Sequence, residues 1–317
     1  MKRYLVTGGA GFIGSSIVKN LILNGYSVKV LDNLSRGNLT KLAEVKGQFE
    51  FISADIRDSK RVINASKDCD GIIHLAYVNG TKFFYSKPNL VLDIGIRGMI
   101  SVIDAGRTNK ISELYLASSS EVYQTPTIIP TPEDIQLVIP DPYNPRFSYG
   151  GGKILSELMA IHMGAKLFKK IVIFRPHNVY GPDMGEEHAI PEFIRRMIFL
   201  KKNNGKKFEI QGTGNETRSY IFIEDFSDAL LTLIKKGRNL NTYNIGTQDE
   251  ISSKNLAKKI ASIVNIDINI AAGKLQKGST LKRCPDTTKI KALGFMPKTN
   301  LTDGLKKTYL WYNNELK

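Results

Sequence analysis

The chain has 317 residues, of which 42% are hydrophobic, so it can bury a large core as an ordinary enzyme does. Its net charge is +15, from 45 basic and 30 acidic residues, but the lysines lie in scattered short groups without the aromatic interleaving of a nucleic-acid groove. We therefore expect no nucleic-acid partner, whereas a phosphate-bearing small substrate or a nearby anionic membrane surface would suit the excess charge.

The composition also argues against a membrane or secreted protein and against a protein held together by disulfides or zinc. No apolar run is long enough for membrane insertion, and the glycine-rich turn inside the first apolar stretch argues against a signal peptide. The two cysteines, Cys69 and Cys284, suggest neither a disulfide framework nor a zinc cluster, so we expect no metal and a cytoplasmic location.

A glycine-rich turn opens the chain. The apolar segment 4–7 runs into Gly8, Gly11 and Gly14 at a Gly-x-x-Gly-x-x-Gly spacing, and an amphipathic stretch follows over 13–23. Glycine permits the tight turn and the close approach of backbone to a pyrophosphate, which the helix N-terminus then binds. The next apolar strand ends in Asp32, where a carboxylate would bond ribose hydroxyls and repel the extra phosphate of NADP. These features predict NAD as the cofactor.

Strand and helix patterns alternate through the first half of the chain. We expect strands near 3–7, 27–31, 49–52, 71–74, 113–117 and 171–175, with helices between them. This alternation is typical of the α/β class, as a Rossmann doubly wound parallel sheet with ligands at the carboxyl ends of its strands. The proline-rich stretch 126–145 is expected to be a surface loop.

The alternation loosens after residue 176. We expect residues 1–175 to form the NAD-binding domain, with its sheet continued by later segments near 220–245. Residues 176–317 would be mainly a smaller, mixed α/β C-terminal lobe that binds the substrate. The segments expected to build that lobe are 189–202, 208–210, 242–245 and 252–264.

Tyr149 and Lys153 form a Tyr-x-x-x-Lys pair far downstream of the glycine turn. Four residues apart on a helix, the two side chains share a face. A base that removes a hydroxyl proton is needed when hydride leaves an alcohol for nicotinamide, and a nearby ammonium would lower the ordinarily high pKa of a phenol. The pair therefore predicts hydride chemistry on an alcohol.

Several motifs in this order resemble the extended short-chain dehydrogenase/reductases that modify nucleotide sugars. They are Thr7 to Gly14, Asp55 to Asp58, His74 to Ala76, Ser118 to Tyr123, Tyr149 with Lys153, Arg175 to Pro182, Arg218 to Ile221, and Leu293 to Pro297. The resemblance covers nearly the whole chain. It implies an NAD-dependent nucleotide-sugar enzyme that forms a homodimer or a higher homo-oligomer through the helices over 86–107 and 149–168.

The resemblance also implies roles for particular residues. Ser119 would bond the reacting hydroxyl, and Glu121 would act in catalysis or bond a neighbouring loop. The cofactor-binding residues would be Gly8, Gly11, Phe12, Ile13, Gly14, Asp32, Asn33, Asp55, Ile56, Leu75, Ala76, Tyr149 and Lys153. The substrate-binding residues would be Ser119, Ser120, Asn178, His188, Arg218 and Arg283, the two arginines clamping a diphosphate through their planar forks.

This sequence departs from the family pattern at three places. Ser120 replaces the aspartic acid that protonates the leaving hydroxyl in 4,6-dehydratases. Gly95 stands where an asparagine usually supports the active-site strand, and Tyr77 replaces a small residue, so its bulk is expected to reshape the cofactor pocket.

The predicted function is therefore oxidation of the sugar C4 hydroxyl, with 4-epimerisation as the outcome. The alternatives are a C4 dehydrogenase, a UDP-glucuronate decarboxylase, a 4,6-dehydratase and a C3/C5 epimerase in which His188 protonates a carbanion. From a different class, a non-catalytic NAD(H) sensor on the same fold stays open.

Overall fold

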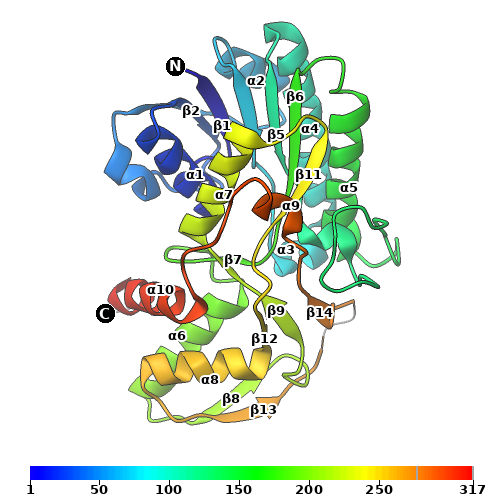
Figure 1. The fold of residues 1–317 in the computed structure, drawn as a ribbon. Coiled ribbons are helices and arrows are strands. Elements are labelled where there is room, and N and C mark those ends of the chain that lie inside the picture. The colour runs from blue at the N-terminus through cyan, green and yellow to red at the C-terminus, as the bar shows by residue number, and fades with distance from the viewer. Residues whose placement is uncertain (276–277, 316–317) are drawn as a thin grey trace.

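Seven parallel strands form the centre of the computed structural model, which describes residues 1–275 and 278–315 (Figure 1). In order across the sheet they are β11 (Asn241–Ile245), β6 (Lys170–Pro176), β5 (Glu113–Ala117), β4 (Gly71–His74), β1 (Arg3–Thr7), β2 (Ser27–Asp32) and β3 (Phe49–Ser53). The six strands expected from the sequence are confirmed to within two residues. The chain order reverses between β1 and β4, so a crevice opens there at the carboxyl ends of the strands.

Helices cover both faces of this sheet, which explains why central strands such as β1, β4 and β6 read as apolar runs rather than as alternating patterns. One face packs against α1 (Phe12–Leu23), α7 (Ile223–Lys236), α9 (Thr288–Lys291) and the 3-10 helix η1 (Leu39–Val45). The other face packs against α2 (Ser59–Ala65), α4 (Pro88–Asn109) and α5 (Phe147–His162). The short α3 (Thr81–Ser86) and the 3-10 helix η2 (Ser120–Tyr123) follow β4 and β5 at the end where the crevice lies.

A smaller lobe lies below the sheet in Figure 1 and has its own apolar core. Its helices are α6 (Ala189–Lys202), α8 (Ser253–Val264) and α10 (Leu301–Glu315). Its short sheets pair β8 (Lys207–Ile210) with β13 (Asn269–Ala272), β7 (Val179–Tyr180) with β10 (Ile221–Phe222), and β9 (Thr217–Ser219) with both β12 (Glu250–Ser252) and β14 (Lys282–Arg283).

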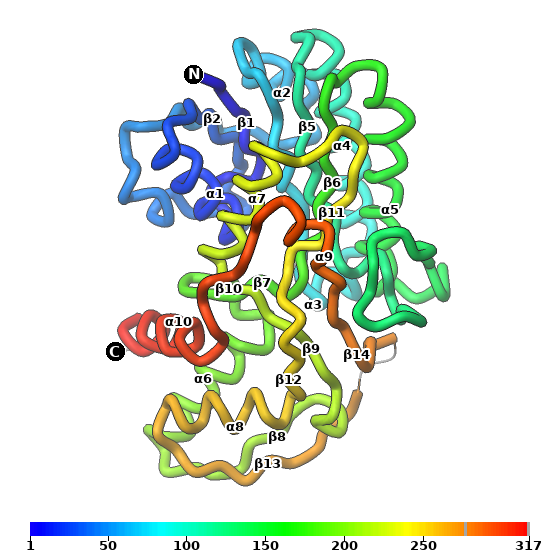
Figure 2. Tube along the Cα trace, viewed as in Figure 1, coloured from blue at the N-terminus to red at the C-terminus, as the bar shows by residue number. Residues whose placement is uncertain are grey.

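The chain passes between the two lobes more than once. Figure 2 shows it leaving β6 for α6, returning through α7 to β11, and descending again to α8. The segment 242–245 pairs along β6 as the seventh strand, within the stretch 220–245 expected to continue the sheet, so the other expectation, that it helps to build the smaller lobe, is wrong. Tyr243, Asn244 and Ile245 are buried there, because a strand covered by helices on both faces is stabilised over its whole length.

Candidate active site

A cavity of about 500 Å³ opens at the carboxyl ends of the strands. It contains nearly all the residues that the sequence nominates, although they come from eight separate segments of the chain. They are Gly8, Gly11, Phe12, Ile13, Gly14, Asp32, Asn33, Asp55, Ile56, Leu75, Ala76, Ser119, Ser120, Glu121, Tyr149, Lys153, Asn178, His188 and Arg283. Within the described residues, the nominated Arg218 does not belong to this lining.

The glycine turn is a close-packed cradle. Gly8 has a φ of +72°, and a Cβ at Gly14 would lie 2.1 Å from the Gly8 carbonyl oxygen. Only glycine lets the start of α1 approach the turn this closely, and that leaves backbone amides facing the cavity. Asp32 at the end of β2 accepts hydrogen bonds from the amides of Ala10 (3.1 Å) and Leu34 (2.9 Å), so its carboxylate is held in place beside the turn.

A second carboxylate lies on the neighbouring strand end. Asp55 accepts hydrogen bonds from the Arg57 guanidinium (2.8 and 2.9 Å) and from Asn33 Nδ2 (3.1 Å). Arg57 lowers the pKa of Asp55 to about 2, so this carboxylate is ionised at neutral pH. Asp55 and Asn33 thus form a fixed polar wall of the cavity.

His74 stabilises the cavity floor rather than acting in chemistry. The Thr7 hydroxyl oxygen accepts the amides of Leu75 (3.2 Å) and Ala76 (3.3 Å), which leaves its proton to donate to His74 Nδ1 at 2.8 Å. Burial lowers the pKa of His74 to about 3, and the ring is therefore neutral. This contact joins β1 to β4 where the crevice opens.

Tyr149, Lys153 and Ser119 meet at one end of the cavity. Tyr149 and Lys153 lie on α5 and are 6% and 3% exposed, and Lys153 Nζ donates to the Ala117 carbonyl at 2.7 Å. Ser119 Oγ accepts the Glu121 amide at 3.1 Å, so the hydroxyl proton is free to be donated elsewhere. The structure therefore brings together the three residues that the sequence proposes for proton transfer.

The electrostatics of this corner differ from the expectation. Burial raises the pKa of Tyr149, and the groups that oppose this are the Ser119 hydroxyl and the Arg36 guanidinium rather than Lys153. Burial also lowers the pKa of Lys153 to about 7, with Glu157 acting in the opposite direction. Both side chains are thus shielded from water, which makes their charge states sensitive to whatever binds beside them.

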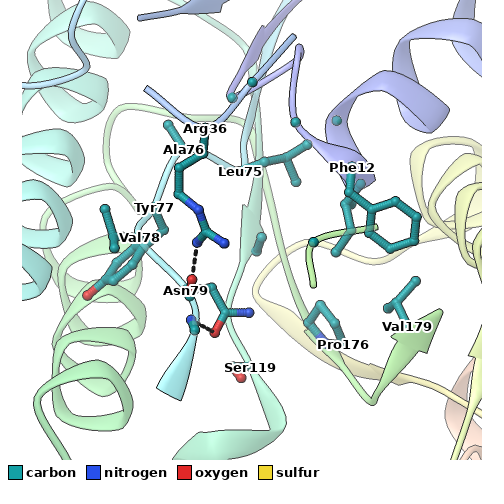
Figure 3. A pocket seen from close by; sticks show the side chains of 18 of the residues that line it. Phe12, Arg36, Leu75, Ala76, Tyr77, Val78, Asn79, Ser119, Pro176 and Val179 are labelled. Atoms are coloured by element: carbon teal, nitrogen blue, oxygen red, sulfur yellow. Dashed lines mark hydrogen bonds between the residues drawn. The ribbon is translucent and has the colours of Figure 1, made fainter. Parts of the chain in front are cut away.

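Arg36 is a cavity residue that the sequence did not nominate. Its guanidinium crosses the cavity to the Asn79 carbonyl (Figure 3), stacks 5.1 Å from the Phe83 ring centroid and pairs with Glu187 at 3.1 Å. The cavity is also lined by Val78, Asn79 and Gly80 in the loop after β4 and by Thr81, the first residue of α3. The rule that ligands bind at strand carboxyl ends could have pointed to these loops, although not to the contact between them.

Glu121 lies among arginines on the opposite wall. It accepts a hydrogen bond from Arg283 at 2.8 Å, and Arg146 lies 3.8 Å away. Arg283, Arg146 and Arg218 together lower the pKa of the Glu121 carboxyl, despite its burial. The N–H groups of Arg218 donate to the carbonyls of Thr217, Thr280 and Leu281, so its side chain is directed along the strands.

The remaining nominated residues come from the smaller lobe. Asn178 has a φ of +39° and its Nδ2 donates to the Ser219 carbonyl at 2.8 Å. His188 immediately precedes α6, and burial together with Arg36 lowers the pKa of its imidazole. A neutral His188 is a hydrogen-bonding group of the cavity rather than a ready proton donor.

The fold and the cavity define a dinucleotide-binding enzyme of the Rossmann type. The cradle that a Cβ would fill, the carboxylate at the end of β2 and the Tyr–Lys pair all fit NAD. Within residues 1–275 and 278–315, no helix is both long and apolar enough to span a membrane. No group of three potential metal ligands occurs in that same part of the chain.

Comparison with known proteins identifies the family of the chain. A profile of the NAD dependent epimerase/dehydratase family matches residues 4–246, and the chain belongs to this family of NAD-dependent enzymes. A putative UDP-glucose 4-epimerase of Methanocaldococcus jannaschii is 33% identical over 98% of both chains.

Two solved structures are similar over almost their whole length. A UDP-glucose 4-epimerase of Thermotoga maritima, solved with UDP-glucose, has a TM-score of 0.88 and 29% identity over 99% of this chain and 100% of that one. DesIV, a dTDP-glucose 4,6-dehydratase of Streptomyces venezuelae solved with NAD, has a TM-score of 0.86 and 26% identity over 98% and 97% of the two chains.

Proposed function

We propose that this chain is a nucleotide-sugar 4-epimerase that oxidises the C4 hydroxyl of its substrate and reduces the 4-keto sugar from the opposite face. The observation that carries the proposal is the convergence of Tyr149, Lys153 and Ser119 in the same cavity as the dinucleotide cradle. The similar M. jannaschii and T. maritima proteins, described as UDP-glucose 4-epimerases, support a nucleotide sugar as the substrate.

Tyr149 is proposed to take and return the C4 hydroxyl proton through its phenolic oxygen. Ser119 can donate its hydroxyl proton to that oxygen and stabilise the phenolate, because its contact with the Glu121 amide is one in which Ser119 accepts and its own O–H stays free. NAD, when bound, accepts a hydride from the sugar carbon and gives it back. The near-complete burial of Tyr149 and Lys153 keeps water from the reacting groups during this exchange.

Arg283 is proposed to bind the substrate's diphosphate from the opposite wall of the cavity. Arg283 as a whole is 7% exposed, and its Nε has no partner among the described residues. A buried donor without a partner is costly, so an anionic ligand there would be strongly favoured. Arg218 stays a predicted partner in this clamp, and its positive charge acts on the same wall.

A second candidate function rests on Glu121. Arginines keep its carboxyl ionised inside the cavity, and an ionised carboxylate is the form that removes a C5 proton. That chemistry would lead to elimination or decarboxylation rather than to inversion at C4. Glu121 is thus either the counter-ion of Arg283 or a base.

A panel of UDP-, GDP-, CDP- and dTDP-sugars incubated in deuterated water, with product NMR, tests these proposals. Inversion at C4 without solvent deuterium is the expected result. Deuterium at C5 would instead assign Glu121 chemistry, and inertness of the whole panel with NAD bound would replace both by a sensor. Tyr149→Phe run in parallel identifies any turnover that does not pass through the phenol.

We further propose a homodimer built on α4 and α5. The two helices pack on each other and carry exposed apolar side chains, namely Leu92, Ile100, Leu155 and Leu158. Sedimentation or light scattering on the NAD-loaded protein measures the assembly directly. The proposed location is the cytoplasm, which suits the two buried free thiols of Cys69 and Cys284.

A further inference from the structure

Tyr77, in the loop after β4, packs against both members of the Tyr–Lys pair. Lys153 Nζ lies 4.0 Å from the centroid of the Tyr77 ring, on its face. The Tyr149 ring meets the Tyr77 ring edge-on at 5.2 Å, with an interplanar angle of 87°. On its other side, Tyr149 stacks on Phe84 at 4.8 Å. The phenol proposed to move the proton is therefore clamped between two aromatic rings.

Two helical glycines make the room that Tyr77 occupies. A Cβ at Gly95 of α4 would lie 2.1 Å from Tyr77 Oη, and a Cβ at Gly152 of α5 would lie 2.2 Å from the same atom. Glycine inside a helix lowers the stability of that helix relative to alanine. Both helices carry this cost at the positions that face Tyr77. Figure 3 shows the ring turned out of the middle of the cavity, toward the helices at its side.

The ring of Tyr77, and not its hydroxyl, makes the contacts with Lys153 and Tyr149. Tyr77 Oη is buried and has no hydrogen-bond partner among the described residues. An unpaired buried hydroxyl contributes nothing favourable, whereas the negative face of an aromatic ring attracts a cation more strongly when water is excluded. The Tyr77 side chain, which replaces the small residue usual in the family, thus lines the side of the cofactor cavity instead of filling it.

We propose that Tyr77 is a positioning residue, whose ring face holds the Lys153 ammonium and whose edge fixes the Tyr149 phenol, in the space that Gly95 and Gly152 leave open. This inference rests on the proposed roles of Tyr149 and Lys153. Without the ring, the contacts left to the ammonium among the described residues are its hydrogen bond to the Ala117 carbonyl and the more distant Tyr149 ring, whose centroid is 5.7 Å away.

The groups around Lys153 decide the direction of a pH effect. On α5 they are Tyr149 and the carboxylate of Glu157; on β4, the neutral His74; at the end of β5, the Ala117 carbonyl and, one residue further, the Ser118 hydroxyl; and after β4, Tyr77. Glu157 and the Tyr77 ring favour the ammonium, and burial opposes it. Replacing the ring by leucine keeps an apolar side chain but removes the attraction, so Lys153 is expected to lose its proton at lower pH than in wild type.

The first experiment compares Tyr77→Phe and Tyr77→Leu with wild type, and uses Tyr143→Leu, at a 94% exposed tyrosine, as the control. With UDP-glucose and UDP-galactose as probes, Tyr77→Phe is expected to stay within about twofold of wild type. Tyr77→Leu is expected to lose about tenfold in kcat, with KM and NAD content little changed and the alkaline limb of the kcat–pH profile, where Lys153 loses its proton, about one pH unit lower. An unchanged kcat and pH profile in Tyr77→Leu would overturn the proposal, and so would a loss confined to stability or NAD content.

The second experiment needs no substrate. The pKa of Lys153 in the NAD-loaded protein is titrated by NMR of isotope-labelled lysine for wild type and Tyr77→Leu, with Lys153→Met used to assign the signal. A downward shift of the Lys153 pKa in Tyr77→Leu supports the positioning role even if the sugar panel is inert, in which case only the proposed function fails. If the panel is epimerised and Tyr77→Leu titrates like wild type, the positioning role fails and the function stands.

Gly152→Ala gives a matched double-mutant cycle. Its Cβ would clash with Tyr77 Oη at 2.2 Å, but Tyr77 Cζ lies 3.6 Å away, an ordinary contact. Gly152→Ala alone is expected to displace the ring and to lower kcat about tenfold, and Tyr77→Phe should restore most of the loss in the double variant. Strictly additive effects in this cycle would contradict the proposed packing.

Discussion

Glu157 and Arg175 form a buried two-bonded ion pair directly behind the active-site corner. Arg175 Nε and Nη2 donate to the two carboxylate oxygens at 2.9 and 2.7 Å, and both side chains are about 5% exposed. The Ser118 hydroxyl donates to the same carboxylate, and Arg175 also donates to Tyr123 Oη at 2.7 Å. The pair therefore ties the helix of Lys153 to the strand end of Ser119 and to β6.

Glu157→Gln is expected to lower the free energy of unfolding by about 3–5 kcal/mol, because the Arg175 charge stays buried without its partner. Denaturant unfolding of the purified protein measures the loss. Glu192→Gln breaks the exposed pair of Glu192 with Arg196 and serves as the control, with an expected change of about 0–1 kcal/mol. Equal losses in the two variants would show that the buried pair is not special.

Tyr149→Phe removes the oxygen that is proposed to exchange the proton and keeps the ring that packs between Tyr77 and Phe84. We expect kcat to fall by about 10²- to 10⁴-fold with NAD content and thermal stability nearly unchanged. Turnover and bound cofactor are measured on the same preparation. A fully loaded variant that works as fast as wild type would remove Tyr149 from the mechanism.

Asp32→Ala tests the choice of dinucleotide. The carboxylate at the end of β2 is positioned by the amides of Ala10 and Leu34, so its charge faces the ribose side of the cradle. Losing a charged hydrogen bond should weaken NAD binding about tenfold and raise the relative affinity for NADP. Calorimetric titration of the NAD-free protein with NAD and with NADP gives the ratio of the two affinities. Glu50→Gln, on the edge strand β3, is the control. An unchanged NAD to NADP ratio would count against this assignment.

Lys153→Met tests the burial of the ammonium through stability. The pKa of Lys153 is about 7 in the folded protein against an ordinary value of 10.5, so between these two pH values the unfolded chain binds the extra proton. Wild-type stability therefore rises with pH in this window, by about 1.4 kcal/mol per pH unit, and the penalty of the buried charge is complete below pH 7. Lys153→Met should lack this slope. If the free energies of unfolding of wild type and Lys153→Met changed with pH in the same way from pH 7 to 10, Lys153 would not be a buried group that titrates in this range.

Much of the fold could be predicted because its signals are local. The first six strands are short segments rich in apolar residues, and the helix α6 begins and ends at the residues that the sequence indicates, 189 and 202. β11 was expected both to continue the sheet and to help build the smaller lobe, because its partner, β6, is 65 or more residues away in sequence and pairing at that distance has no local pattern.

The candidate site divides in the same way. The glycine spacing, the acid at residue 32 and the Tyr-x-x-x-Lys pair are short-range features whose chemistry follows from residue type and spacing. Arg36 reaching Asn79, and Arg283 binding Glu121 across 162 residues, depend on loops that meet only after the sheet has formed. The charge states of Tyr149 and Lys153 also depend on the tertiary structure, because burial is the largest influence on the pKa of each.

The sequence by itself determined the α/β class, the dinucleotide cradle and the reacting pair, because periodicity, turn geometry and helical spacing are properties of neighbouring residues. Only the tertiary structure decided what surrounds that pair. Tyr77, Gly95 and Gly152 look like unrelated departures along the chain, and they become one packed unit because three separate segments converge behind Lys153.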